Sequence, residues 1–304
     1  MQIRSGKGQK TVVLAHLAAL FAVGVWGATF VSTKVLLEQG MNAVEIYIYR
    51  FLLAYILLIP FTWRKIFANS LRDEVLFLLC GLTSGAIYFI AENTALMYTL
   101  AGNVSLITSI SPLLTVLLIG AFYKSERPSK GVLFGSLIAL VGVGCVVFNS
   151  GFSMEVNPLG DLLALGAALS WAFYCIILRK LNVNYSALFI TRKSFFYGIV
   201  TALPFLLFET HFTSPARFLE PDILWNMLFL GLVASLLCYF LWALAMKIVG
   251  TIKINNYMYL QPVFTLILAY FILAERISFL GYTGCVLILG GLYLSDRLAK
   301  RKKQ

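Results

Sequence analysis

The amino-acid sequence predicts an all-α integral membrane protein whose ten transmembrane helices form two inverted repeats of five. Three observations predict this class: the composition, the long runs without charge, and the placement of the basic residues. Apolar residues make up 60% of the 304 residues and charged residues only 12%, and the mean hydropathy is +0.88. Soluble domains are about half apolar and about one-quarter charged. A water-soluble fold of this length cannot bury so much apolar surface.

Crossing the hydrocarbon layer takes a helix of about 20 mostly apolar residues, and the chain holds many runs of that kind. The longest charge-free run, residues 93–123, exceeds one crossing, and Ala101-Gly102-Asn103 predicts a turn inside it. The ten predicted helices cover residues 12–33, 44–62, 75–98, 103–123, 131–149, 159–178, 189–208, 223–246, 252–273 and 279–295. The first lacks the small-residue cleavage pattern of a signal peptide, so we expect it to stay in the protein.

The basic residues segregate to one side of the predicted helices. With ten crossings both termini share a side, and 20 of the 24 Lys and Arg residues fall there. Because Lys and Arg accumulate in short cytoplasmic loops, we expect a multi-pass protein of the plasma (inner) membrane with cytoplasmic N- and C-termini. This placement accounts for the net charge of +11 without a nucleic-acid partner.

Several chemistries have no support in the sequence. It contains no Gly-rich phosphate loop for ATP, and no nucleophile, base and orienting acid that pattern together, so we expect no enzyme. His16 and His211 are isolated, which does not favour a metal site. We expect no cofactor. The cysteines lie inside predicted helices without the spacing of a disulfide framework or a zinc site, at Cys80, Cys145, Cys175, Cys238 and Cys285.

The two halves of the chain share motifs. We assign one repeat to residues 1–150 and the other to 151–304, and five helices in each force the two into opposite orientations. Inverted repeats can hold two similar conformations, open to opposite sides, around a shared site at mid-depth. The matches pair Glu126-Arg127, Gly135 and Gly142 with Glu275-Arg276, Gly284 and Gly291, 149 residues later, and pair Trp26 with Trp171, Tyr49-Arg50 with Thr191-Arg192, Pro60-Phe61 with Pro204-Phe205, and Pro112 with Pro262.

The pattern Trp26-Gly27-Ala28-Thr29-Phe30…Lys34, together with the duplicated Glu-Arg…Gly…Gly motif, resembles the EamA-type transporters of the drug/metabolite transporter (DMT) superfamily. The resemblance covers essentially the whole chain, as two tandem copies of one unit. It implies a ten-helix fold with a central cavity lined mainly by the first, third, fourth, sixth, eighth and ninth helices. It also implies transport of amino acids, metabolites or drugs, often outward.

Glu92 is the acidic residue that lies well inside a predicted helix. Burying a carboxylate in lipid costs about 2.5–3.5 kcal/mol or more, so such a residue faces a cavity or a partner. Two interpretations stay open: Glu92 binds a cationic group of a solute or a proton, or it forms a static pair with Arg50 or Lys34. The residues that share its helical face are mostly small and are typical of helix–helix packing: Gly81, Gly85, Tyr88 and Ala95.

Arg50 and Arg192, or its neighbour Lys193, occupy matching places in the two halves of the chain. Either side chain can attract an anionic solute or pair in a gate. The alternative is that each extends to the head groups and anchors its helix. Both interpretations stay open for Arg50, and anchoring is favoured for Arg192, which lies near a predicted helix start.

Pro112 and Pro262 predict helix breaks at matching positions, because proline frees a backbone carbonyl that only protein or a wet cavity can satisfy. Paired breaks of this kind indicate a binding site between repeats. Polar and aromatic residues near the breaks and on the facing helices complete the predicted site. We expect the solute to contact Trp26, Tyr88, Glu92, Asn93, Trp171, Tyr239, Trp242, Asn256, Tyr259 and Gln261.

These features favour a secondary, non-ATP transporter that works by alternating access and exports amino acids or related metabolites and drugs. Its driving force is the solute's own gradient or the proton gradient. One alternative is an importer of a vitamin or nucleoside-like solute. A channel is the alternative from another class.

Overall fold

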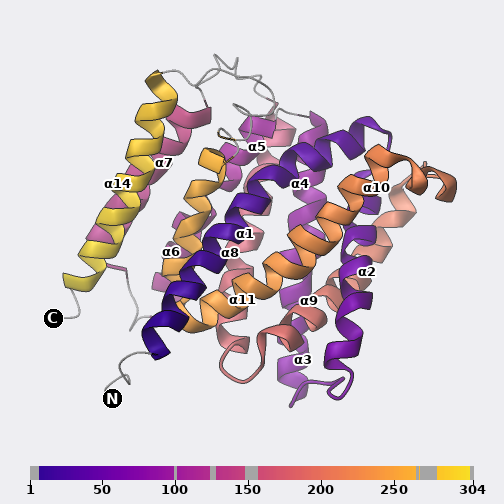
Figure 1. Ribbon diagram of the computed structural model, residues 1–304, viewed down its shortest axis with the longest axis horizontal. Coiled ribbons are helices and arrows are strands. Elements are labelled where there is room, and N and C mark those ends of the chain that lie inside the picture. The colour runs from indigo at the N-terminus through magenta and orange to yellow at the C-terminus, as the bar shows by residue number, and fades with distance from the viewer. Residues whose placement is uncertain are drawn as a thin grey trace.

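The computed structural model describes residues 7–98, 101–123, 128–147, 157–264, 267 and 279–301 (Figure 1), and within these ranges the chain is helical with no strand. The first half contains α1 (Lys7–Glu38), α2 (Ala43–Thr62), α3 (Leu71–Gly81), the π-helical segment η1 (Leu82–Ala86), α4 (Ile87–Tyr98), α5 (Ala101–Thr108), α6 (Ser111–Phe122) and α7 (Lys130–Val147). The second half contains α8 (Pro158–Leu181), α9 (Ala187–Ala202), the 3-10 segments η4 (Leu203–Phe208) and η5 (Pro215–Leu219), α10 (Pro221–Leu228), the π-helical segment η6 (Phe229–Leu237), α11 (Cys238–Val249), α12 (Thr251–Asn255), the 3-10 segment η7 (Asn256–Leu260) and α14 (Phe279–Arg301).

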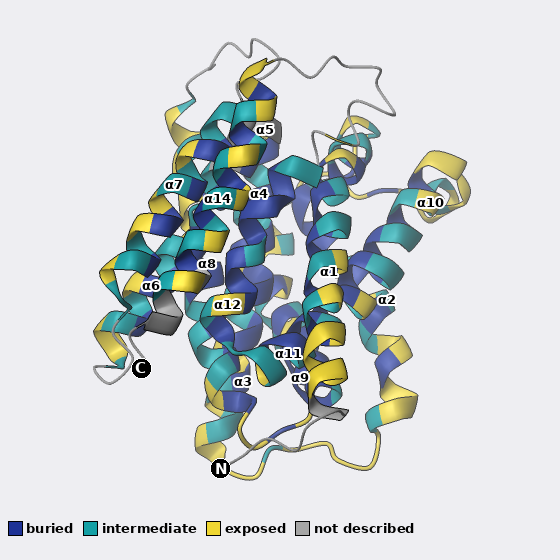
Figure 2. Ribbon diagram, turned by 60° about the vertical axis from the view of Figure 1, so that its left-hand side comes forward, coloured by how far each residue is buried: buried dark blue, intermediate teal, exposed yellow. Residues whose placement is uncertain are grey.

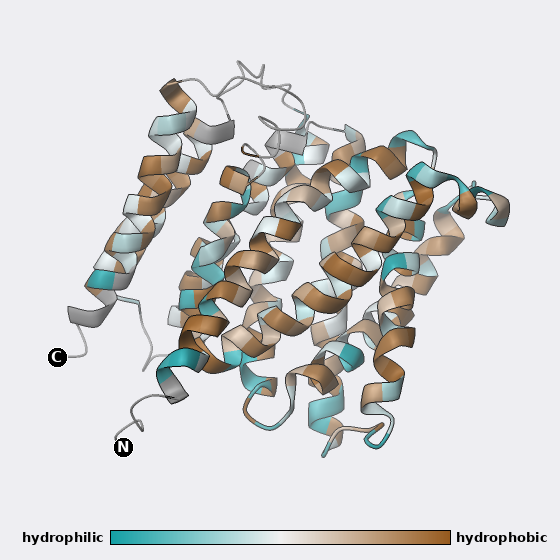
Figure 3. Cartoon of the chain, viewed as in Figure 1, coloured by the Kyte–Doolittle hydropathy of each residue, from teal (hydrophilic) through white to brown (hydrophobic). Residues whose placement is uncertain are grey.

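The helices are long and apolar enough for a multi-pass membrane protein. Shorter apolar helices accompany the long ones at Ser111–Phe122, Lys130–Cys145 and Phe279–Ser295. Apolar residues run along most of the helices (Figure 3), and many large apolar side chains are exposed. The buried residues lie where helices face one another (Figure 2). An apolar exterior of this kind suits lipid and not water. Within the described residues, five helices satisfy the length and hydropathy of a full crossing: Gln9–Glu38, Ala43–Thr62, Leu71–Tyr98, Pro158–Leu181 and Pro221–Val249.

These five helices coincide with five of the predicted ones, and the other predicted helices are matched less simply. The predicted helix 103–123 is divided into α5 and α6, and the predicted helix 189–208 finishes in the 3-10 turns of η4. The ends of the predicted helices 131–149 and 252–273 lie outside the described residues. The total of ten crossings therefore stays a prediction. The start of α1 and the end of α14 lie on the same side of the molecule (Figure 1).

Side chains that cap helix N-termini explain several of the observed boundaries. Asn42 and Glu45 form a capping box at the start of α2: the Glu45 amide donates to Asn42 Oδ1 at 2.7 Å, and the Asn42 amide donates to the Glu45 carboxylate at 3.4 Å. Asn157 caps α8 by accepting from the Gly160 amide at 3.1 Å, with Pro158 in the first turn. Each cap satisfies amides that have no partner within the helix.

The duplicated glycine motif holds α7 against α14, and the two helices run side by side in Figure 1. A Cβ atom added at Gly142 would lie 2.7 Å from the carbonyl oxygen of Gly284, and one at Gly135 would lie 2.6 Å from that of Gly291. The motif glycines of one half therefore face those of the other half. Small residues are the usual means of bringing two membrane helices into close contact.

A second pair of glycines connects the halves near the two π-helical segments. A Cβ atom at Gly81, just before η1, would lie 2.6 Å from the carbonyl oxygen of Ser194 on α9. One at Gly231, within η6, would lie 3.3 Å from the carbonyl oxygen of Arg50 on α2. The helix that carries each π-helical segment thus packs on a helix from the other half of the chain.

We expect Gly142→Ala to lower the stability of the protein by about 1–3 kcal/mol, the range typical of overpacking. The added methyl group meets the backbone of α14, which has no flexible atom to move aside. Gly144→Ala is the matched control, because nothing lies within 4 Å of a Cβ atom there. The thermal unfolding of the two purified variants in detergent measures the difference. Equal unfolding temperatures would contradict close packing of α7 on α14.

Candidate functional site

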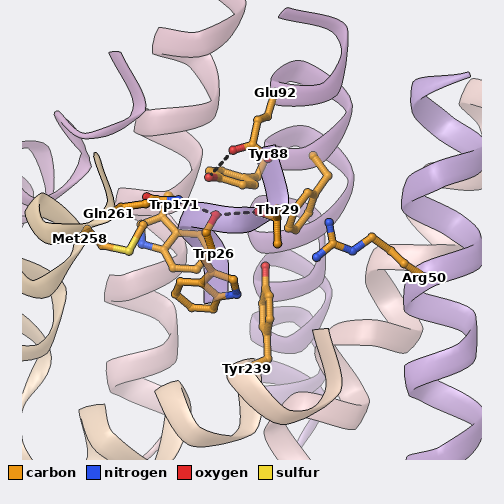
Figure 4. Close-up of a pocket in the computed structure, with 10 residues that line it drawn as sticks. Trp26, Thr29, Arg50, Tyr88, Glu92, Trp171, Tyr239, Met258 and Gln261 are labelled. Carbon is orange, nitrogen blue, oxygen red and sulfur yellow. Dashed lines mark hydrogen bonds between the residues drawn. The ribbon is translucent and has the colours of Figure 1, made fainter. Parts of the chain in front are cut away.

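A small cavity lies in the middle of the helix bundle (Figure 4). The centre of a water molecule has a volume of about 20 Å³ in which to move, which is room for about one water molecule. The cavity wall combines aromatic rings with one cationic and one anionic side chain. It is formed by Trp26, Thr29, Arg50, Tyr88, Phe89, Glu92, Trp171, Tyr239, Met258 and Gln261.

The aromatic rings of the cavity form one connected cluster. The ring centres of Trp26 and Trp171 are 5.4 Å apart in an edge-to-face arrangement, and Tyr239 lies 5.7 Å from Trp26. Trp242 packs behind this wall at 5.0 Å from Trp26. Edge-to-face contacts are a favourable geometry for aromatic pairs, so each ring restricts the position of the next.

Main-chain carbonyls of the π-helical segments hold two of these rings. The indole Nε1 of Trp26 donates to the carbonyl oxygen of Ala234 in η6 at 3.0 Å. The hydroxyl group of Tyr239 donates to the carbonyl oxygen of Ser84 in η1 at 3.0 Å. π-Helical turns are rare and occur frequently at functional sites. Here they supply the hydrogen-bond acceptors that orient the cavity wall.

Glu92 is buried in α4 and reaches the cavity together with Tyr88, one helical turn before it (Figure 4). The Tyr88 hydroxyl group donates to Glu92 Oε1 at 2.8 Å. No salt bridge within 4.0 Å joins the Glu92 carboxylate to Arg50 or to Lys34, among the described residues. Lys34 instead donates to the carbonyl oxygen of Leu96 at 3.1 Å. The static ion pair that the sequence left open is absent from this conformation.

Arg50 extends from α2 toward the same cavity, and its side chain is 1% exposed. Nε donates to the hydroxyl oxygen of Ser235 at 2.9 Å, and the guanidinium carbon lies 4.7 Å from the centre of the Phe89 ring. Nη2 has no hydrogen-bond partner. The cavity therefore holds a buried cation with a free donor and a buried carboxylate that a single hydroxyl group supports.

Arg192 does not share this environment, so the expectation of equivalent places for Arg50 and Arg192 is corrected. Its guanidinium donates to the carbonyl oxygen of Thr62, the last residue of α2, at 2.7 Å and to that of Ile66, in the turn after α2, at 3.2 Å. The two prolines Pro60 and Pro204 are 144 residues apart, and the same separation places Ser194 opposite Arg50. The glycine contacts at the carbonyl oxygens of Ser194 and Arg50 agree with that register.

Four of the residues predicted to contact the solute lie away from the cavity wall. Asn93 follows Glu92 and so faces another direction on the helix, where its Nδ2 donates to the carbonyl oxygen of Ala43 at 3.0 Å. Asn256 donates to the hydroxyl oxygen of Ser295 on α14 at 3.3 Å. Tyr259 and Trp242 are buried without lining the cavity. The structure brings the other six to the wall: Trp26, Tyr88, Glu92, Trp171, Tyr239 and Gln261.

Three residues of the wall were not expected from the sequence, and each lies one helical turn from a residue that was expected there. Thr29 follows Trp26 by three positions, Phe89 precedes Glu92 by three, and Met258 precedes Gln261 by three. Residues three or four apart share a helix face. Extending each predicted contact by one turn along its helix would have found all three.

The regular α-helix is interrupted just before each of the two prolines, Pro112 and Pro262. α5 ends at Thr108 and α6 begins at Ser111, one residue before Pro112. The Ser111 hydroxyl group donates to the carbonyl oxygen of Thr108, which is the carbonyl that an amide at position 112 would otherwise reach. In the second half, the 3-10 turns of η7 precede Pro262.

Comparison with known proteins agrees with this architecture. The model of the EamA-like transporter family matches residues 13–148 and again residues 158–295. A solved crystal structure superimposes with a TM-score of 0.76 at 20% identity and covers 95% of this chain and 99% of its own, which shows the fold.

Curated relatives match over nearly their full length. A protein of Archaeoglobus fulgidus named an uncharacterized transporter is 28% identical over 284 residues, which is 92% of this chain and 96% of the relative. A probable amino-acid metabolite efflux pump of Salmonella typhimurium is 29% identical and covers 91% of this chain and 93% of its own. A probable terminal-alkyne amino-acid exporter of Streptantibioticus cattleyicolor is 26% identical, with 94% and 95% covered.

The relatives are named as transporters, efflux pumps or exporters, and the family is one of transporters and not of enzymes. The apolar helices and the buried polar cavity fit that assignment. The chain is a multi-pass membrane protein that transports small molecules, and it belongs to the EamA-like transporter family.

Proposed function

We propose that this protein is a secondary exporter of amino acids or closely related metabolites that works by alternating access without ATP. The observation that carries the proposal is the presence of Arg50 and Glu92 at one small cavity without an ion pair between them. The relatives named for amino-acid or amino-acid metabolite export support the substrate class.

A zwitterionic solute complements the charges of this cavity. An α-amino acid carries a carboxylate, which suits the guanidinium of Arg50 and its free Nη2. It also carries an ammonium group, which suits the carboxylate of Glu92. A bound zwitterion would thus compensate both buried charges, each of which is costly to hold at membrane depth without a partner.

The aromatic cluster would contact the rest of the solute. Trp26, Trp171 and Tyr239 present rings that bind apolar groups and also attract a cation through their faces. Tyr88 supports Glu92 through its hydroxyl group. Gln261 adds an amide to the wall, and Trp242 buttresses the cluster from behind.

The size of the cavity supports alternating access over a continuous pore. Sites for small ligands measure about 300–1,000 Å³, whereas this cavity offers about 20 Å³ to the centre of a water molecule. A solute enters only if helices move apart. We propose that the five-helix repeats 1–150 and 151–304 exchange conformations around the cavity, as inverted repeats do in other transporters. A channel would need an open path in place of so small a space.

The proposed topology has ten crossings, with both termini in the cytoplasm and the protein in the plasma membrane. The bias of Lys and Arg toward one side supports it, as does the shared side of the start of α1 and the end of α14. The proton gradient remains one candidate driving force, with Glu92 as the group that would carry the proton.

We expect Arg50→Gln to weaken binding of a transported amino acid by about 10-fold or more, since a hydrogen bond to a charged group contributes about 1.5–3 kcal/mol. The N-acetylated amino acid, which keeps the carboxylate, should lose affinity as well, and the decarboxylated amine should not. Ligand-induced shifts in thermal unfolding measure all three compounds. Arg64→Gln, at an exposed position, is the control. Unchanged affinity in the Arg50 variant would exclude a carboxylate contact.

We expect Glu92→Gln to show the opposite pattern. The amino acid and the amine should bind less tightly, because both present an ammonium group, while the N-acetylated compound should bind as before. Transport in proteoliposomes at several pH values tests the proton: a protein coupled through Glu92 loses its pH dependence in this variant. Unaltered uptake together with an unshifted pH profile would eliminate both roles of Glu92.

We expect cysteines introduced at Gln2 and Gln304 of a cysteine-free variant to be protected from a membrane-impermeant maleimide in intact cells. A cysteine at Glu38, which is exposed at the end of α1, should be labelled from outside. Permeabilised cells provide the control that all three sites are reactive. Labelling of only one of the two terminal cysteines in intact cells would rule out an even number of crossings.

A further inference from the structure

We propose that Asn255 is a positioning residue that sets the place of Trp171 on the cavity wall and links it to the helix break before Pro112. The inference rests on the proposed function only in that the cavity binds the solute. Asn255 ends α12, is 1% exposed, and does not line the cavity itself. Its effect on a solute therefore has to pass through other residues.

The side chain of Asn255 joins three helices. Its Nδ2 donates to Thr115 Oγ1 on α6 at 2.8 Å. Its Oδ1 accepts from the indole Nε1 of Trp171 on α8 at 3.2 Å, and from the thiol of Cys175 at 3.4 Å. The indole N–H can only donate, so the amide oxygen has to face Trp171 and the amide nitrogen has to face Thr115.

The chain of hydrogen bonds continues from Thr115 to the helix break. Thr115 Oγ1 donates to the carbonyl oxygen of Ser111 at 2.8 Å. Ser111 is the first residue of α6, directly before Pro112, and its hydroxyl group donates to the carbonyl oxygen of Thr108 across the break. The threonine hydroxyl donates to Ser111 and accepts from Asn255, so every group is used in one consistent direction. The series connects the break in the first half with the cavity wall through a residue of the second.

The matching tryptophan of the other repeat is held in a different way. Trp26 donates to a main-chain carbonyl, that of Ala234, whereas Trp171 donates to a side chain on another helix. The place of the Trp171 indole therefore depends on where α12 lies relative to α6 and α8. α12 leads directly into the 3-10 turns of η7, which precede Pro262. A displacement of α12 would break the hydrogen bond between Trp171 and Asn255 and free the indole ring to turn. Asn255 is thus placed to couple the helix breaks to the shape of the cavity.

The first test observes Trp171 directly and needs no solute. The full chain is labelled with indole-¹⁵N tryptophan in nanodiscs, and Trp171→Phe identifies the Trp171 resonance. We expect Asn255→Ala and Thr115→Val each to shift that resonance and to speed its exchange with water. Thr115→Val nearly preserves volume and is one bond removed from Trp171, so it keeps the test valid if Asn255→Ala fails to fold. Asn182→Ala is the matched control, since Asn182 is a buried amide that donates to the carbonyl oxygen of Ala243 instead.

The second test measures the consequence for the solute. We expect Asn255→Ala and Trp171→Phe each to weaken binding of the transported amino acid about fivefold, the effect of one neutral hydrogen bond. Because both remove the same interaction, the double variant should be no weaker than the more severe single variant, and additive losses would show two independent effects. An unmoved Trp171 resonance in both Asn255→Ala and Thr115→Val, or additive losses of affinity, would overturn the proposal. If no amino acid binds the wild-type protein, the proposed function fails while the resonance test still decides the role of Asn255.

Discussion

The structure depends on one constraint of the bilayer: a polar or charged group at membrane depth has to find its partners inside the protein, because lipid offers none. Arg50 and Glu92 are two such charges, buried on α2 and α4. Helices from both halves of the chain surround them and exclude lipid. Backbone carbonyls, hydroxyl groups and ring faces then supply the partners, as in the contacts of Arg50 with Ser235 and Phe89. The cavity is the small space that remains between these two charges once the helices have packed around them.

To enclose these charges the helices have to lie close together, and small residues at their contacts allow this. The glycines of α7 and α14 bring two backbones together where the motif of one half meets the motif of the other. Gly81 and Gly231 do the same for the helices with π-helical segments, which pack on α9 and α2. The carbonyls of those segments then orient Trp26 and Tyr239. The helices that carry the π-helical segments thus pack against the other half of the chain, and the carbonyls of these segments orient the rings of the cavity wall.

The cavity is small, and each of its two charges has few hydrogen-bond partners. It has room for about one water molecule, and Arg50 and Glu92 beside it are both buried. Glu92 accepts one hydrogen bond from Tyr88, and Arg50 keeps a free donor. A site with unused capacity at both charges gains most from a solute that brings the opposite charges in the right order. In the proposed alternating access, the same few side chains would take part both in binding the solute and in the movement of the helices.

By itself the sequence determined the membrane class, the run of apolar helices, the duplicated motifs and the family resemblance. Hydropathy and motif order are properties of short segments of the chain, and an apolar segment favours a lipid environment whatever the tertiary contacts are. It also pointed to Trp26, Glu92 and Trp171, since a carboxylate inside a span and a repeated tryptophan are visible without a fold. Only the tertiary structure decided that Arg50 reaches the cavity while Arg192 binds the end of α2 and the turn after it. It alone showed Asn255 bridging α6 and α8. These contacts join residues far apart in the chain, and they depend on helix register and rotation, which hydropathy does not encode.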